Sequence, residues 1–257
     1  MRFMQENAKI ISKTEIAKNI FDCLLNCPSI AKKASPGQFI NILVKGKTLR
    51  RPISICDIDK DNENIRIVFE IRGEGTEILA KKQAGDFYDI TGPLGNGFLI
   101  NDFDKKAVFV GGGIGTPPLF GAAKLFSSNA AVFLGFRSRS AVILEEDFKL
   151  AKNQIFIATD DGSYGYKGLI TEPLKEHLEK NKCDIIYSCG PTPMLKAVSN
   201  IAESFNVPCK ISLEQRMACG VGACLTCACK VKEKDGSEKF TQLCRFGPVF
   251  NSKEVVL

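Results

Sequence analysis

The sequence has no apolar run long enough to cross a bilayer as a helix, which excludes an integral membrane protein of the helical kind. Its first residues are polar and charged and lack the apolar core of a secretory signal, so we expect a cytoplasmic protein. The 35 Lys and Arg exceed the 29 Asp and Glu, but they are scattered along the chain, which argues against a nucleic-acid partner. The one histidine, His177, lies on a polar helical stretch between Glu176 and Glu179. We expect it to be solvated, which argues against a hydrolase that uses it as a base.

The 257 residues, of which 44% are apolar, are enough for more than one domain. From Lys9 to Phe98, short strands alternate with turn residues at the spacing of an antiparallel barrel or sandwich. Around Ile65 to Arg72, one face is apolar and is predicted to be core; the other face carries Arg66, Val68, Glu70 and Arg72.

After Asn101-Asp102, apolar runs alternate with helical stretches, which predicts a parallel, doubly wound sheet. From Glu214 onward the chain is cysteine-rich and poor in apolar periodicity, as in segments that need a metal to hold them. The predicted organisation is therefore an antiparallel barrel over 1–101, an α/β domain over 102–213 and a small metal-binding domain over 214–257. The predicted strands of the α/β domain are 107–110, 130–134, 155–159, 185–187 and 209–213, and its predicted helices are 117–126, 171–180 and 193–202.

Five of the eleven cysteines lie between Cys219 and Cys244. The spacing Cys219-x4-Cys224-x2-Cys227, followed by Cys244, is that of a plant-type 2Fe-2S cluster. Zinc is the alternative, but zinc sites favour paired C-x2-C motifs and this segment has one. Cys229 competes with Cys227 for the third position, and the x2 spacing favours Cys227, which leaves Cys229 as a buried neighbour.

Two segments of the predicted barrel suit a phosphate-bearing flavin. Arg51-Pro52-Ile53-Ser54 offers a guanidinium fork for a pyrophosphate and a hydroxyl for the flavin ring. Gly75 and Thr76 precede a helical stretch and could present backbone N–H groups to phosphate. The alternatives are an ordinary Arg-Pro loop and a plain turn with a threonine cap.

Two segments of the predicted α/β domain suit a dinucleotide. Gly111-Gly112-Gly113-Ile114-Gly115-Thr116 follows a strand and opens a helix, although Thr116 breaks the G-x-G-x-x-G pattern. Cys189-Gly190-Pro191 ends another strand at the edge where ligands bind in such sheets. Arg137 and Arg139 follow the second strand in place of a ribose-binding acid, which leaves NAD and NADP both open. Each segment alone is also compatible with a tight turn.

Five segments, in this order, resemble one family over nearly the whole chain. They are Arg-Pro-Ile-Ser, Gly-x-Gly-Thr, Gly-Gly-Gly-Ile-Gly-Thr-Pro-Pro, Cys-Gly-Pro-Thr-Pro-Met and the cysteine segment. The sequence is similar to the electron-transfer subunits of NAD-dependent (class 1B) dihydroorotate dehydrogenase. The resemblance implies a ferredoxin-reductase-like fold with an FAD barrel, an NAD domain and a 2Fe-2S region. It implies FAD contacts from Arg51 to Ser54, from Val68, Phe69 and Glu70, and from Gly75 and Thr76. It implies cluster ligation by Cys219, Cys224, Cys227 and Cys244.

In that family the partner is an FMN-containing catalytic subunit in a heterotetramer of two plus two chains. Electrons then run from dihydroorotate through FMN, the cluster and FAD to NAD, in pyrimidine biosynthesis. One position departs from the family pattern, because Phe246 replaces the usual Asp after the last cluster cysteine. Ligation is unaffected, and the change bears on cluster electrostatics or on the fit to the partner.

Two rival functions stand beside this one. The first is the small subunit of a related reductase, such as an NADH-dependent ferredoxin:NADP oxidoreductase; that family tends to replace one cluster cysteine with Asp, whereas all four positions here are Cys. The second is a non-enzymatic metal-binding interaction protein, which would require every glycine loop to be accidental.

Overall fold

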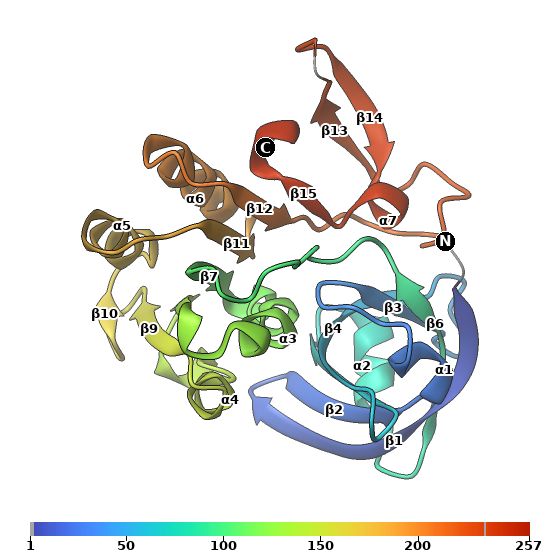
Figure 1. The fold of residues 1–257 in the computed structure, drawn as a ribbon. Coiled ribbons are helices and arrows are strands. Elements are labelled where there is room, and N and C mark those ends of the chain that lie inside the picture. Colours follow the sequence, from blue (N-terminus) through green and yellow to red (C-terminus); the bar gives the residue numbers. More distant parts are fainter. Residues whose placement is uncertain (1–2, 234) are drawn as a thin grey trace.

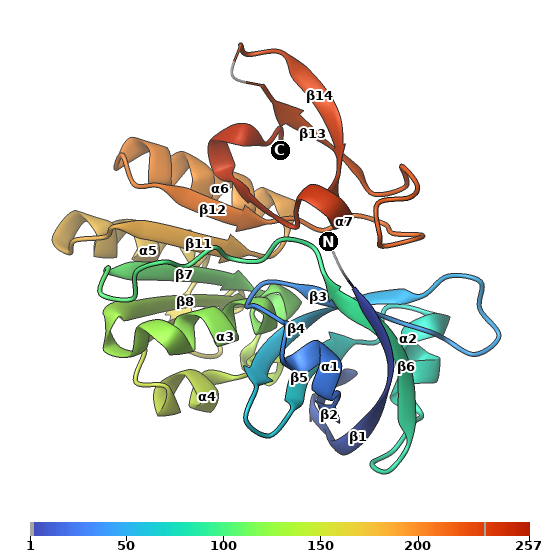
Figure 2. The ribbon, with the colours of Figure 1, turned by 45° about the vertical axis from the view of Figure 1, so that its right-hand side comes forward.

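The computed structural model describes residues 3–233 and 235–257; Met1 and Arg2, at the start of the polar N-terminal stretch, and Lys234 lie outside the described residues. A closed barrel and a seven-stranded sheet lie side by side, and a two-stranded hairpin projects from one end of the molecule (Figures 1 and 2). The predicted fold class, an antiparallel barrel with a parallel α/β domain and a small C-terminal region, is confirmed. No helix in the described ranges is long and apolar enough to cross a membrane.

The barrel is antiparallel and closes in the order β1-β2-β5-β4-β3-β6. Alternate residues such as Ile40, Ile65 and Ile67 are fully buried in its interior, as the period of two requires. Its strands are β1 Met4–Ala17, β2 Ile20–Asn26, β3 Phe39–Ile42, β4 Arg51–Asp59, β5 Asn64–Glu70 and β6 Phe87–Leu94, with the short helices α1 Pro28–Ala31 and α2 Glu74–Ala80.

Strand β5 corrects one expectation, because both of its faces are covered. Val68, placed by the sequence on the non-core face, is only 4% exposed and packs with residues of the α/β region. On the same face, Arg66 pairs with Asp22 at 2.6 Å and also with Asp147 of α4 (Glu145–Leu150). The outer face of this strand is thus an interface between the barrel and the sheet, which a single-strand pattern does not reveal.

The sheet has the order β10-β9-β8-β7-β11-β12-β15, and β15 alone is antiparallel to its neighbour. Val108 and Val110 pack with α5 and α6 on one face, whereas Phe109 packs with α3 and α4 on the other. The strands are β7 Ala107–Gly112, β8 Ala130–Phe136, β9 Gln154–Thr159, β10 Tyr166–Lys167, β11 Ile185–Cys189, β12 Cys209–Ser212 and β15 Val249–Asn251. The helices are α3 Pro117–Phe126, α5 Thr171–Lys180 and α6 Thr192–Ser204, with 3-10 turns at Gly113–Gly115, Ser127–Asn129, Arg139–Ala141 and Ser252–Glu254.

His177 is less solvated than the sequence suggested. Its ring packs edge-on against Phe133 and Phe156, with centroids 5.2 and 5.5 Å away, and burial lowers its pKa. The expectation of a fully solvated side chain is wrong, because the helix turns this residue toward the sheet while Glu176 and Glu179 stay exposed.

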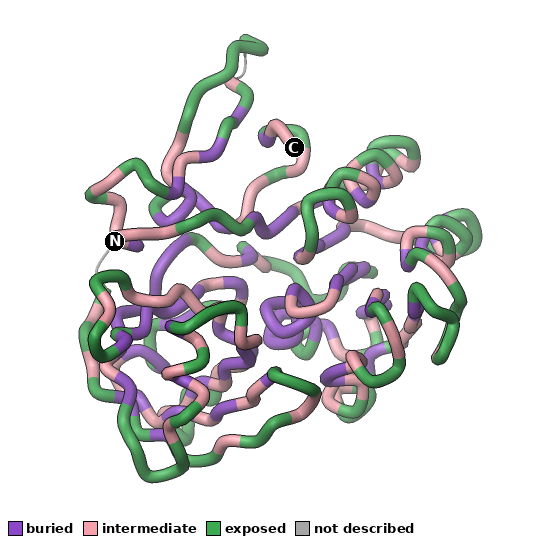
Figure 3. The backbone as a smooth tube through the Cα atoms, turned by 180° about the vertical axis from the view of Figure 1, so that it is seen from behind, coloured by how far each residue is buried: buried purple, intermediate pink, exposed green. Residues whose placement is uncertain are grey.

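The C-terminal segment forms a hairpin of β13 Ala228–Lys232 and β14 Glu238–Gln242, then α7 Leu243–Phe246, and returns as β15 to the edge of the sheet. Its buried residues, among them Leu243 and Cys229, share a core with Phe39 and Leu94 of the barrel. Figure 3 shows buried segments following the barrel strands and the central sheet, while the outer end of the hairpin is exposed.

Candidate functional site

A cavity lies where the barrel, the sheet and the C-terminal segment meet. Residues of β3, β4, β5 and α2 contribute to its wall, and Cys189 and Ser212 line it from the sheet. Met217 and Leu243 extend the lining into the cysteine-rich region, so the cavity touches all three parts of the molecule. The barrel residues that line it are Phe39, Pro52, Ile53, Ser54, Val68, Phe69, Glu70, Arg72 and Thr76.

Arg51 and Gly75 lie against each other beside this cavity without lining it. A Cβ on Gly75 would lie 2.2 Å from Arg51 Nε, so only glycine lets the guanidinium approach the first turn of α2. Arg51 Nη1 donates to the carbonyl of Leu49 at 2.6 Å, which fixes the side chain. Lys47 and Arg51 lower the pKa of Glu74 in the same turn, so one carboxylate already offsets part of the positive charge at this helix start.

The Thr76 hydroxyl serves the local turn as well as facing the cavity. It accepts the backbone N–H of Arg72 at 2.9 Å and donates to the carbonyl of Gly73 at 3.0 Å. The threonine cap weighed from the sequence is absent, because Gly73 is the N-cap residue of α2 and Thr76 lies inside its first turn.

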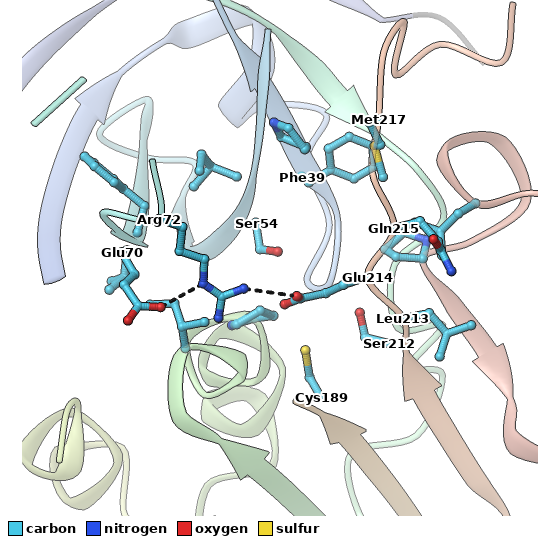
Figure 4. A pocket seen from close by; sticks show the side chains of 18 of the residues that line it. Phe39, Ser54, Glu70, Arg72, Cys189, Ser212, Leu213, Glu214, Gln215 and Met217 are labelled. Atoms are coloured by element: carbon cyan, nitrogen blue, oxygen red, sulfur yellow. Dashed lines mark hydrogen bonds and ion pairs between the residues drawn. The ribbon is translucent and has the colours of Figure 1, made fainter. Parts of the chain in front are cut away.

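Arg72 connects the barrel to the segment that leads into the cysteines. Its Nε donates to Glu70 Oε2 at 2.8 Å, and its Nη1 lies 3.6 Å from Glu214 Oε2 (Figure 4). Both carboxylates are thus engaged by one guanidinium across the cavity wall.

A second cavity, of about 700 Å³, adjoins the first and lies over the carboxyl edge of the sheet. Gly112 at the end of β7 and Gly113 and Gly115 of the turn after it line this cavity, and Gly190 and Pro191 line it from the loop after β11. The two cavities share one wall, which consists of Glu70, Arg72, Ile114 and Glu214.

The glycine loop is shaped by close approach of backbones. A Cβ on Gly115 would lie 2.5 Å from the carbonyl oxygen of Cys189, and Gly113 has φ +52 with open space beside it. Gly111 and Thr116 do not line either cavity; Thr116 is fully buried, and its hydroxyl would lie 3.0 Å from a Cβ on Gly111. These two residues therefore shape the loop from behind.

Cys189 ends β11 directly beside Gly111 of β7, as the two motifs at one sheet edge predicted. Its thiol faces the first cavity, while Gly190 and Pro191 face the second. Burial raises the pKa of Cys189 to about 12, so it is a neutral thiol near neutral pH.

The cysteines at the four predicted ligand positions lie together in two pairs. Cys219 Sγ and Cys224 Sγ are 3.3 Å apart, and the backbone N–H of Cys244 points to Cys227 Sγ at 3.5 Å. A further N–H, from Gly222, points to Cys244 Sγ at 3.2 Å. Within 3–233 and 235–257, no three Cys, His, Asp or Glu side chains are placed to hold a single metal ion.

The two pairs differ in environment. The hydroxyl of Thr226 and backbone N–H groups lower the pKa of Cys224 to about 6, so this partly buried sulfur is readily a thiolate. Burial raises the pKa of Cys244 to about 12. Cys229 is buried nearby in β13, in agreement with its expected role as a neighbour.

Comparison with known proteins bears on the family. Residues 214–256 match the model of the iron-sulfur cluster binding domain of dihydroorotate dehydrogenase B. The chain is 41% identical to the "Dihydroorotate dehydrogenase B (NAD(+)), electron transfer subunit" of Caldanaerobacter subterraneus subsp. tengcongensis, over 97% of both chains. It is also 41% identical to the protein of the same name from Geobacillus kaustophilus, over 98% of this chain and 99% of that one.

The chain belongs to the dihydroorotate dehydrogenase B electron transfer subunit family. The family expected from the ordered motifs is therefore confirmed, and its members are oxidoreductase subunits.

Solved structures agree on the fold. A chain of the NADH-dependent reduced ferredoxin-NADP oxidoreductase superposes with a TM-score of 0.85 at 32% identity, covering 98% of this chain and 90% of that one. The ferredoxin reductase of carbazole 1,9a-dioxygenase, at 19% identity, superposes with a TM-score of 0.69 over 81% of this chain and 68% of that chain. The latter likeness concerns the fold alone.

Phe39 and Arg72 carry no sequence signal of this family's site and come from separate barrel segments. Glu214 and Met217 belong to the segment that leads into the cysteines, and only the fold brings all four to one wall. Arg137 was singled out by its place after the second strand, and it lines the second cavity with Ser140 and Asp160. Arg139 instead stacks on Tyr164, with 5.2 Å from its guanidinium carbon to the ring centroid.

Proposed function

We propose that this chain carries electrons between a nicotinamide nucleotide and a catalytic subunit that oxidises dihydroorotate, in pyrimidine biosynthesis. The observation that carries the proposal is the contact of two cavities across one wall, with the first cavity also reaching the cysteine region. A flavin in the first cavity would thus adjoin both a nucleotide in the second and the cluster. When bound, FAD supplies the change from two-electron hydride transfer to single-electron transfer.

FAD fits the first cavity by the donors in it and beside it. Arg51 and the backbone of Gly75 and Thr76 would hold the pyrophosphate, since the guanidinium already lies over the first turn of α2. Ser54 presents its hydroxyl into the cavity (Figure 4). The remaining contacts would come from Pro52, Ile53, Val68, Phe69 and Glu70.

NAD fits the second cavity. Its pyrophosphate would lie on the loop Gly111–Thr116, where Gly113 leaves open space, and its nicotinamide would reach the shared wall past Gly190 and Pro191. Cys189 lines the first cavity directly before Gly190 and Pro191, so its neutral thiol would lie beside the flavin without separating it from the nicotinamide.

A 2Fe-2S cluster fits the four thiols better than one zinc ion does. Each iron of such a cluster takes two thiolates, and here the sulfurs come as the pairs Cys219 with Cys224 and Cys227 with Cys244. A tetrahedral zinc site would need all four around one point. The N–H groups of Gly222 and Cys224 that point at sulfur are the kind of donors that tune cluster potentials.

Oxidation of the pyrimidine would take place on the partner, an FMN-containing subunit assembled as two plus two chains. Abstracting a carbon-bound proton needs a free base. Glu70 and Glu214 are instead engaged by Arg72, and the Cys189 thiol is neutral. We assign the flavin barrel to residues 1–101, the nucleotide domain to 102–213 and the cluster domain to 214–257.

The test reconstitutes the stringently purified chain with FAD, iron and sulfide, and follows orotate formation with and without the FMN-containing partner. We expect NADH to reduce artificial dyes through this chain alone, and orotate to form from dihydroorotate only after the partner is added. Substantial orotate production by the chain alone would contradict the division of labour.

A second candidate is the small subunit of a related reductase, favoured by the TM-score of 0.85 to the ferredoxin-NADP oxidoreductase chain. Failure of the dihydroorotate-oxidising partner to couple to NAD, together with intact NADH-to-dye activity, would favour it.

A further inference from the structure

Two asparagines of the barrel contact the backbone next to cluster cysteines. Asn41 lies on β3, whose side chains Ile40 and Ile42 fill the barrel and whose other face turns toward the cysteine region. The Asn41 side chain is 1% exposed, and its Nδ2 donates to the carbonyl of Cys219 at 3.5 Å. A polar group buried to this degree is costly unless it is bonded.

The neighbouring glycine shows how closely the two parts approach. Gly220 has φ +70, and a Cβ there would lie 2.5 Å from Asn41 Nδ2. Only glycine therefore allows the cysteine loop to lie on this amide. In this orientation the amide N–H of Asn41 faces the Cys219 carbonyl oxygen; the opposite orientation would place two oxygens together.

Asn41 is itself held from the barrel side. Arg50 Nη1 donates to the backbone carbonyl of Asn41 at 3.3 Å and pairs with Asp89 at 2.9 Å. The strand that carries the amide is thus braced by an ion pair between its neighbours. Asn41 Oδ1 accepts no hydrogen bond from the described residues. The side chain is therefore held through its Nδ2, which bonds the carbonyl of Cys219 in the cysteine loop.

Asn96 makes the matching contact at the other end of the cluster site. Its Nδ2 donates to the carbonyls of Arg245 and Phe246, at 3.2 and 3.1 Å, directly after Cys244. Its backbone N–H donates to the carbonyl of Gly247 at 2.6 Å. One asparagine therefore holds the loop of the first cluster cysteine and the other holds the loop of the last.

We propose that Asn41 and Asn96 are positioning residues for electron transfer, which fix the cluster relative to the flavin. The inference rests on the proposed function, because it concerns the step between those two groups. Both contacts join a barrel side chain to a backbone carbonyl beside a cluster cysteine, so a slack contact would let the cluster loops move relative to the barrel. Both side chains are neutral, so they hold the loops without adding charge beside the cluster.

The test uses the full chain loaded with FAD and cluster, mixed rapidly with NADH without oxygen. Flavin bleaching and the electron paramagnetic resonance signal of the reduced cluster are followed as separate steps. In Asn41→Leu, which is close in shape, stays uncharged and removes the N–H donor, we expect flavin reduction at the wild-type rate and cluster reduction slowed by about 10-fold or more. Asn96→Leu should slow it less, because the backbone N–H of residue 96 still bonds Gly247, and the double variant should be slowest.

The matched control is Asn26→Leu. Asn26 is a barrel asparagine whose Nδ2 donates to the carbonyl of Glu63 at 3.2 Å, within the barrel. The control should match the wild type in both steps. If Asn41→Leu loses its iron, Asn96→Leu carries the test, since that side chain is exposed.

Equal slowing of both steps, or wild-type kinetics in the double variant at full iron content, would overturn the inference. A wild-type chain in which NADH reduces neither flavin nor cluster would defeat the proposed function instead.

Discussion

The barrel and the cysteine-rich C-terminal region are stabilised by different interactions. The barrel closes six strands around its own apolar core, with Ile65 and Ile67 fully buried. The C-terminal region has a two-stranded hairpin and shares its core with Phe39 and Leu94. An isolated two-stranded hairpin is marginal in water. The barrel therefore depends mainly on its own burial, whereas the cysteine region depends on its neighbours and on its sulfur ligands.

Removing one of the four predicted cluster sulfurs should produce the largest difference between the two regions. We expect Cys224→Ser to abolish the 2Fe-2S absorption while FAD stays bound, because the flavin cavity is lined by other residues. Hydrogen exchange should then rise over 214–257 and stay unchanged in the barrel. Cys229→Ala is the matched control and should retain its iron. A Cys224→Ser protein with full iron and sulfide would refute the ligand assignment.

Truncating a buried side chain of the barrel should lower the free energy of unfolding far more than truncating an exposed side chain of the hairpin. Ile67→Ala removes a fully buried side chain and should lower the free energy of unfolding by about 2–5 kcal/mol. Phe240→Ala, at a side chain that is 68% exposed, should change it by roughly 0.5 kcal/mol or less. Denaturant titrations measure both, and similar losses for the two variants would contradict the account.

Arg51 tests the barrel as a flavin site. Arg51→Ala should weaken FAD binding by about 1.5–3 kcal/mol, the usual range for a hydrogen bond to a charged group. Arg51→Lys should compensate only in part, because lysine lacks the planar fork. Flavin fluorescence on dilution measures the affinity, and Lys60→Ala, which removes an exposed charge past the end of the same strand, is the control. Unchanged affinity in Arg51→Ala would reject the pyrophosphate contact.

Substitution of His177, which packs against the sheet, should give the smallest effect on stability. Burial lowers its pKa, so the folded protein resists protonation more than the unfolded chain does. Stability from the neutral ring is thus present above the unfolded pKa and is lost as the pH falls through the lower folded pKa. His177→Gln should lose less stability than the wild type between about pH 7 and 5. Parallel pH profiles for the two proteins would contradict the packing assigned to the ring.

Much of the fold could be predicted from local patterns. Helices α3 and α5 begin and end at the predicted residues, because proline at a first helical position and apolar periodicity are local signals. Strand β15 was not predicted, since three residues carry little pattern and its pairing with β12 depends on the chain returning to the sheet. The cysteine spacing likewise predicted that four thiols lie together. Asn41 contacts Cys219 and Glu214 contacts Arg72 across long sequence separations, which no spacing reveals.

The most direct measurement of the central claim is the cofactor content of the purified, unmutated chain. The account predicts bound FAD with iron and acid-labile sulfide in equal amounts, and a visible spectrum in which NADH bleaches the flavin and then reduces the cluster. Zinc in place of iron, or a chain that binds no flavin, would contradict it.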